Sequence, residues 1–228
     1  MGIFDWLFGS SKNEFVAPPR DVQPIHVREA LTSNSNGYAF RFGNEETLLA
    51  DAYGVKSIHL AIEAARKAIE EIIGDNQSII QQKIFARRGE AQLHFMALQI
   101  AVYYVLADKL CSSNRNVLNE IAKGIAYGLK HLFNDVPDAN MPQYVYEIFQ
   151  EYAESLVREL NNPPTIHDPF DMGATADLVT EYVSKQCLVD TLLADNPAEE
   201  FKIKMHASGR GITILFLLLI EKRIAFVG

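Results

Sequence analysis

The sequence is short of the features by which many common functions are recognised. Its 228 residues contain no GxxxxGK[ST], GxGxxG, GxSxG or HExxH motif. A phosphate-binding glycine loop, a nucleophile elbow and a two-histidine zinc helix are therefore not indicated. There are only two cysteines, Cys111 and Cys187, far apart and without a CxxC pair. This pattern is typical neither of a zinc ribbon nor of a disulfide scaffold, and we expect two reduced, buried thiols and no cofactor.

Basic residues and long apolar runs are also scarce. Lys and Arg number 21 against 29 Asp and Glu, which gives a formal net charge of −8. A field of this sign repels phosphate backbones and anionic lipid, so we expect no nucleic-acid partner. The apolar tail at residues 212–220 is well short of the ~20 residues of a membrane helix, so no transmembrane segment is predicted.

The chain begins MGIFDWLFGSSKNEF, with several large apolar side chains before a polar linker. Asp5 interrupts the apolar run and no basic residue precedes it, unlike in a secretory signal, and Trp6 occupies the position where myristoylation motifs have Ser or Thr. We therefore expect a cytoplasmic protein. Residues 1–24 are predicted to be an apolar segment and proline-containing linker, in which Trp6 and Phe8 either dock on the body or contact a partner.

Residues 25–228 are predicted to form one helical domain. Helical periodicity covers most of the segment from 55 to 196, with separate helices predicted at residues 116–133 and 142–162. Residues 91–110 are apolar almost all round, which is typical of a helix covered on several sides. Gly124 and Gly128, on neighbouring turns, predict the close approach of a partner helix. We therefore predict an all-α fold, a single bundle of about six to eight helices around residues 91–110.

Two segments leave the choice between helix and strand open. Residues 38–42, YAFRF, alternate as a short strand does, but an isolated strand has nothing to pair with, and we expect a loop or the edge of a helix. The apolar tail 212–220 fits a buried strand or a buried helix. With no convincing partner strand elsewhere, we predict a helix there.

One set of residues follows the ligand order of an HD-type metal phosphohydrolase. The dipeptide His167-Asp168 has His131 before it and Asp190 or Asp195 after it. Because the dipeptide stands in a proline-bounded loop rather than on a helix that would fix both ligands, we expect no metal site. An HD-like hydrolase that uses His131, His167 and Asp168 is kept as an alternative function.

A second set, Arg87, Glu90 and His94, lies on one stripe of the predicted central helix. Glu90 and His94 stand four residues apart and could share a proton or a metal ion, but one such pair supplies only two ligands, too few for a ferritin-like di-iron site. We therefore predict that His94 is a structural core residue satisfied by a neighbouring carboxylate.

The third set is an acidic stripe, Glu147, Glu151 and Glu154, on a predicted helix. Like charges four residues apart destabilise a helix slightly, and a basic partner would remove that cost. A solvated face partly neutralised by Arg158 is the simpler interpretation. We predict a non-catalytic protein that acts through protein–protein interaction, for example an acidic inhibitor or immunity-type protein. A structural subunit of a homo-oligomer is the further alternative.

Overall fold

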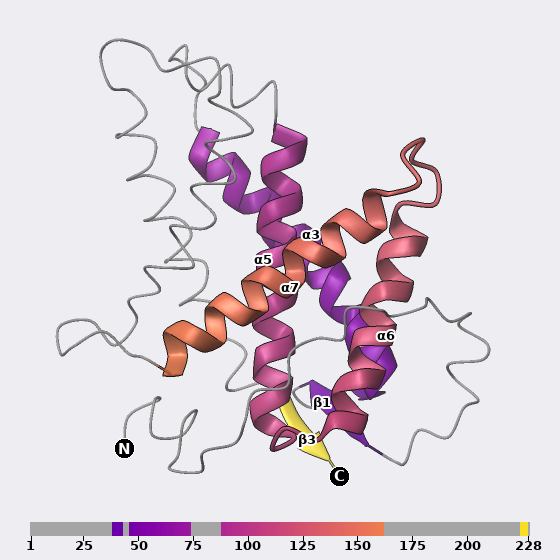
Figure 1. Ribbon diagram of the computed structural model, residues 1–228, viewed down its shortest axis with the longest axis vertical. Coiled ribbons are helices and arrows are strands. Elements are labelled where there is room, and N and C mark those ends of the chain that lie inside the picture. Colours follow the sequence, from indigo (N-terminus) through magenta and orange to yellow (C-terminus); the bar gives the residue numbers. More distant parts are fainter. Residues whose placement is uncertain (1–37, 43–45, 74–87, 162–223, 228) are drawn as a thin grey trace, which may run out of the picture.

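The computed structural model describes residues 38–42, 46–73, 88–161 and 224–227 (Figure 1). Their elements, in chain order, are β1 (Ala39–Phe42), β2 (Glu46–Leu49), α3 (Ala50–Ile73), α5 (Arg88–Leu110), α6 (Arg115–Leu132), α7 (Met141–Asn161) and β3 (Ile224–Val227). Most of these residues are helical, as the all-α prediction requires. The predicted N-terminal extension lies outside the described residues, and the bundle of six to eight helices stays a prediction.

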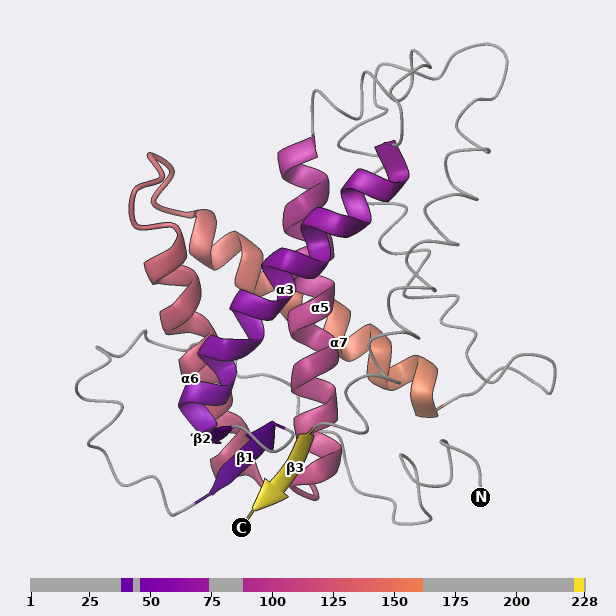
Figure 2. The ribbon, with the colours of Figure 1, turned by 180° about the vertical axis from the view of Figure 1, so that it is seen from behind.

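Helix α5 lies at the centre of the described helices, with α7 in front of it in Figure 1 and α3 in front of it in the reverse view of Figure 2. Every residue from position 94 to 108 is buried. This burial confirms the prediction that the segment is covered on several sides. None of the helices in the described part of the chain is long and apolar enough to cross a bilayer.

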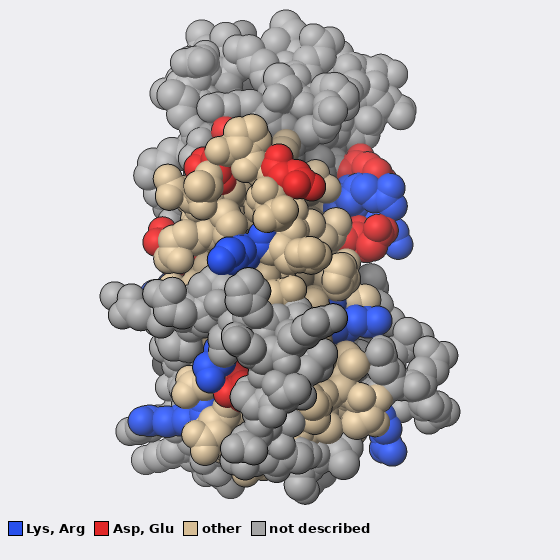
Figure 3. Space-filling model, turned by 90° about the vertical axis from the view of Figure 1, so that its right-hand side faces the viewer, with Lys and Arg blue, Asp and Glu red and all other residues tan. Residues whose placement is uncertain are grey.

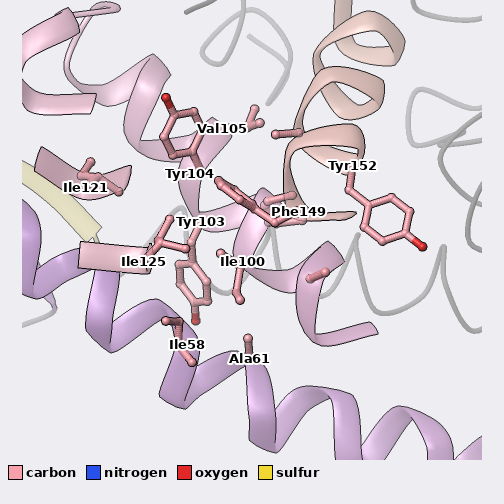
Figure 4. Packing of buried hydrophobic residues seen from close by; sticks show 14 of the residues in the cluster. Ile58, Ala61, Ile100, Tyr103, Tyr104, Val105, Ile121, Ile125, Phe149 and Tyr152 are labelled. Carbon is pink, nitrogen blue, oxygen red and sulfur yellow. The ribbon is translucent and has the colours of Figure 1, made fainter. Parts of the chain in front are cut away.

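Side chains of α5 fill the space toward both neighbouring helices. The Tyr53 hydroxyl of α3 donates a hydrogen bond to the main-chain oxygen of Tyr103, at 2.9 Å. On the other side, the rings of Tyr104 and Phe149 meet edge to face, with centroids 5.5 Å apart. Figure 4 shows Tyr103 directed toward Ile58 of α3, and Tyr104 beside Phe149 of α7. The core is therefore continuous across the three helices.

Helices α3 and α6 touch backbone to backbone. A Cβ atom added at Gly124 would overlap the main-chain carbonyl of Asp51, and one added at Gly54 would overlap the carbonyl oxygen of Ile121. A Cβ at Gly128 would lie 2.5 Å from Cδ1 of Ile58. The predicted close approach of a partner helix at Gly124 and Gly128 is confirmed, and α3 is that partner.

Local residues set the ends of α6 and α7. Asn114 caps α6, because its side-chain oxygen accepts hydrogen bonds from the N–H groups of Asn116 and Val117, at 3.1 and 3.5 Å. Pro142 stands in the first turn of α7, where proline costs no helical hydrogen bond. These signals are local in sequence, which explains why both helices were predicted close to their observed bounds.

The three strands form an antiparallel sheet in the order β2-β1-β3. Phe40 of β1 is paired with Leu48 of β2 and with Phe226 of β3, and its ring lies 4.4 Å from that of Tyr53. The prediction of a loop or helix edge at residues 38–42 is therefore wrong, because β1 has two partners and one of them comes from near the end of the sequence. Residues 224–227 are likewise strand, whereas the predicted helix at 212–220 lies outside the described residues.

Candidate functional site

Helix α7 has one buried and one solvent-exposed face. Its buried residues are Val145, Tyr146, Ile148, Phe149, Tyr152, Ala153, Ser155, Leu156 and Val157. Glu147, Glu151 and Glu154 are all exposed, and the Gln143 side-chain amide donates a hydrogen bond to Oε1 of Glu147 at 3.0 Å. The acidic stripe is therefore open to solvent, while its role in binding stays a prediction.

The acidic stripe belongs to a longer run of one charge sign. Residues 133–157 contain five acidic residues and no Lys, Arg or His. The two further acids, Asp135 and Asp138, lie in the connection between α6 and α7, and all five acidic residues are exposed. We call residues 133–157 the acidic segment. Only its helical half was predicted, although the absence of Lys, Arg and His from residues 133–157 can be read from the sequence.

Other described helices carry acids that are paired with bases. On α3, the Arg66 guanidinium lies 3.1 Å from Oε2 of Glu63. On α6, the Lys123 ammonium lies 2.8 Å from Oε1 of Glu120. Figure 3 shows acidic and basic side chains side by side at the upper right of this view, whereas elsewhere on this face the acidic ones lie mostly in the upper part and the basic ones mostly lower down. The acidic segment differs because no base occurs within it.

His94 of α5 is fully buried between two tyrosines of α7. Its Nδ1 lies 3.1 Å from the Tyr152 hydroxyl, and its Nε2 lies 3.4 Å from the Tyr144 hydroxyl. Both tyrosine rings meet the imidazole edge to face. His94 was predicted to be a structural core residue, and the structure places it in the core. The predicted carboxylate partner is not what faces the ring nitrogens; both face tyrosine hydroxyls. These tyrosines were missed because they lie on a different helix, far along the chain.

Burial sets the protonation of this contact. It lowers the pKa of His94 to about 4, from an ordinary value of 6.5, so the imidazole is neutral at pH 7. A neutral imidazole has one donor and one acceptor nitrogen. One tyrosine hydroxyl therefore donates to the ring and the other accepts from it. This arrangement links α5 to α7 and places no ionised group in the contact at neutral pH.

Two other polar side chains of α5, Gln99 and Asp108, are fully buried. Within the described residues, no hydrogen-bond partner in good geometry is found for either side-chain polar atom of Gln99 or for either carboxylate oxygen of Asp108, although the Ser113 side chain lies near that carboxylate. Burial raises the pKa of Asp108, and Ser113 and Lys109 lower it in part. The ionised form of Asp108 is therefore disfavoured by its surroundings.

Of the candidate metal ligands, only His131 lies within the described residues. His131 is exposed in the last turn of α6, where its ring stacks on that of Tyr127 with centroids 6.1 Å apart. His167 and Asp168 lie outside the described residues, as do Trp6 and Phe8. Within residues 38–42, 46–73, 88–161 and 224–227, no group of three or more His, Cys, Asp or Glu is placed to hold a metal ion.

Comparison with protein-family models, with curated proteins and with solved structures found no match. A function therefore has to be inferred from the residues of the chain itself.

Proposed function

We propose that the protein is a non-catalytic binding protein that holds a basic protein partner on the acidic segment. The observation that carries the proposal is the exposure of all five acidic side chains in a stretch with no basic residue. A surface of one sign steers an oppositely charged partner and speeds its association. Binding also relieves the repulsion between Glu147 and Glu151, which stand one turn apart. An acidic inhibitor or immunity-type protein is one concrete form of this function.

The spacing of the glutamates suits a basic polypeptide segment. At ~1.5 Å rise per residue, Glu147, Glu151 and Glu154 form a row about 10 Å long on one side of α7. Basic residues four apart on a helix stand ~6 Å apart, and those two apart on a strand stand ~6.6 Å apart. Either conformation can place successive guanidinium groups against successive carboxylates, and arginine can bind a carboxylate through two hydrogen bonds.

A homo-oligomer is the second candidate, because consecutive helices carry opposite charge. Helix α6 contains three Lys or Arg residues and one Glu, whereas α7 contains four Glu and one Arg. The acidic face of one copy could therefore bind the basic face of another. The HD-type hydrolase draws no support from the described residues, in which His131 is the single member of that ligand set.

The proposal is tested with a fluorescein-labelled, C-terminally amidated peptide of 12 residues that contains four arginines, and a matched peptide with glutamates instead. Fluorescence anisotropy measures the affinity of each for the full chain. The reversal Glu147→Lys with Glu151→Lys is expected to weaken binding of the arginine peptide about tenfold or more, equivalent to about 1.4 kcal/mol.

The control reverses two exposed glutamates of α3, Glu63→Lys with Glu70→Lys, which changes the net charge equally. We expect less than a threefold loss for this variant, in line with the small effect of distant, screened charges. Equal losses for the two variants would show that net charge alone matters and would contradict the proposal. A concentration-dependent mass that is abolished by the α7 variant would favour the homo-oligomer.

A further inference from the structure

Large hydrophobic side chains are exposed in only one stretch of the described residues. They are Leu132, Val136 and Tyr144, with relative exposures of 40, 36 and 36%. All three lie within residues 132–144, where the chain turns from α6 into α7 (Figure 1). Single exposed apolar residues are ordinary on a protein surface. Their confinement to one short stretch, which we call the α6–α7 corner, indicates a contact surface.

Hydrogen bonds give the corner a defined backbone. The N–H of Val136 donates to the carbonyl of Phe133, and that of Met141 donates to the carbonyl of Asp138, both at 3.1 Å. The side chains of Phe133 and Met141 pack against the core. The three exposed apolar side chains therefore project from an ordered turn, and binding to them costs little conformational entropy.

The corner is continuous with the acidic segment. Asp135 and Asp138 lie within it and are exposed. Tyr144, in the first turn of α7, precedes Glu147 by three residues, so the two lie on neighbouring turns of one helix side. Tyr144 also has its hydroxyl 3.4 Å from Nε2 of His94, which fixes the ring at the boundary between core and surface.

We propose that the α6–α7 corner is an apolar anchor site for the basic partner, which presents one large apolar side chain beside its arginine or lysine residues. This inference rests on the proposed function. The acids of the corner select a basic polypeptide and oppose an anionic lipid surface, which a basic patch would attract. Interfaces commonly concentrate their energy in one apolar anchor surrounded by polar contacts, and Val136 and Leu132 supply the receiving surface.

The test compares two labelled, amidated peptides of 12 residues, each with four arginines, that differ at one central position. One peptide has Phe there and the other has Ser. We expect the Phe peptide to bind the full wild-type chain about tenfold more tightly than the Ser peptide, because one well-buried anchor side chain increases affinity by about this factor. Leu132→Ser with Val136→Ser should reduce this ratio to about one to two and leave the affinity for the Ser peptide unchanged.

A conservative variant, Leu132→Met with Val136→Ile, keeps apolar surface at both positions and should retain the tenfold ratio. Thermal unfolding of each variant checks that the substitutions leave the fold intact. A ratio near one in the wild type, or a ratio near ten that persists in the serine variant, would overturn the anchor site.

The two proposals fail in different ways. If the Phe and Ser peptides bind equally well, and both are weakened by Glu147→Lys with Glu151→Lys, only the anchor site is refuted. If neither arginine peptide binds more tightly than the glutamate peptide, the proposed function is refuted and the anchor site with it. If the ratio is tenfold and depends on the corner, both proposals stand.

Discussion

Helices α6 and α7 follow one another in the chain, yet they are held to the rest of the molecule by opposite means. Helix α6 meets α3 through backbone, with Gly54 and Gly124 leaving no room for a side chain. Helix α7 meets α5 through large side chains, including Phe149 and Tyr152. A backbone contact tolerates no added atom, whereas a side-chain contact can be adjusted by rotamers and by protonation.

The two helices also differ in what they present to solvent. The one acidic residue of α6, Glu120, has a basic neighbour in Lys123. The acidic row of α7 continues a stretch of 25 residues, 133–157, without one basic side chain. Packing of α7 depends on its opposite, apolar face, so stability alone does not require this charge. We therefore propose that the acidic face of α7 serves a contact with another molecule.

The largest effect is expected at the backbone contact. Gly124→Ala would place a methyl group on the main-chain carbonyl of Asp51, so α3 and α6 would have to separate. We expect the free energy of unfolding to fall by more than about 3 kcal/mol, at the upper end of overpacking effects. Urea denaturation followed by circular dichroism measures it, and a loss below about 1 kcal/mol would show that the two helices adjust easily.

The side-chain contact should be sensitive to acid instead. Burial lowers the pKa of His94 from 6.5 to about 4, so between these values the unfolded chain binds a proton that the folded chain does not. The free energy of unfolding therefore contains a contribution from the neutral, buried His94 that is fully present above pH 6.5. It is lost as the pH falls toward 4, and the total loss is about 3 kcal/mol.

His94→Gln removes the titrating group and keeps a hydrogen-bonding side chain. Urea denaturation of wild type and variant at pH 7, 5 and 4 should give free energies of unfolding that converge as the pH falls. Parallel pH profiles would mean that His94 is not held neutral in the fold.

A smaller effect, in the stabilising direction, is expected from replacing Asp108, a second buried group on α5. Burial raises the pKa of Asp108, so the folded state favours the protonated carboxyl, and stability falls as the pH rises through the ordinary value of 3.8. Asp108→Asn imitates the protonated form and should raise the free energy of unfolding at pH 7, with little gain at pH 3. Thermal unfolding at both pH values measures this gain, and a destabilised variant at pH 7 would show that the ionised carboxylate is needed.

The smallest effect is expected at Gly89, which serves as the counterpart of Gly124. No atom of the described residues lies within 4 Å of a Cβ added at Gly89, and the residue is exposed near the start of α5. Gly89→Ala should therefore stabilise the protein by up to about 1 kcal/mol through helix propensity. Denaturation midpoints of the two alanine variants, compared side by side, should move in opposite directions.

Local patterns were enough to predict the helices. The segments predicted at 91–110, 116–133 and 142–162 correspond closely to α5, α6 and α7, because apolar periodicity and helix-end signals are contained within each segment. The exposed position of Glu147, Glu151 and Glu154 follows from the same periodicity.

The features that were missed depend on residues far apart in sequence. Strand β1 lies at the centre of the sheet, and one of its two neighbours is β3, which comes from near the other end of the chain. No local pattern reveals such a distant partner. The tyrosines that contact His94 are 50 and 58 residues away. Their alignment depends on how α7 crosses α5, which is a property of the packed core rather than of either helix.

Carboxylate footprinting tests the central claim most directly. The full chain is coupled with glycinamide through a carbodiimide, with and without the amidated arginine peptide, and mass spectrometry measures labelling at each acidic residue. Labelling should fall at Glu147, Glu151 and Glu154 when the peptide is bound, while exposed Glu63 of α3 stays unchanged. Equal protection of Glu63, or undiminished labelling of the three α7 glutamates in the bound state, would contradict the account.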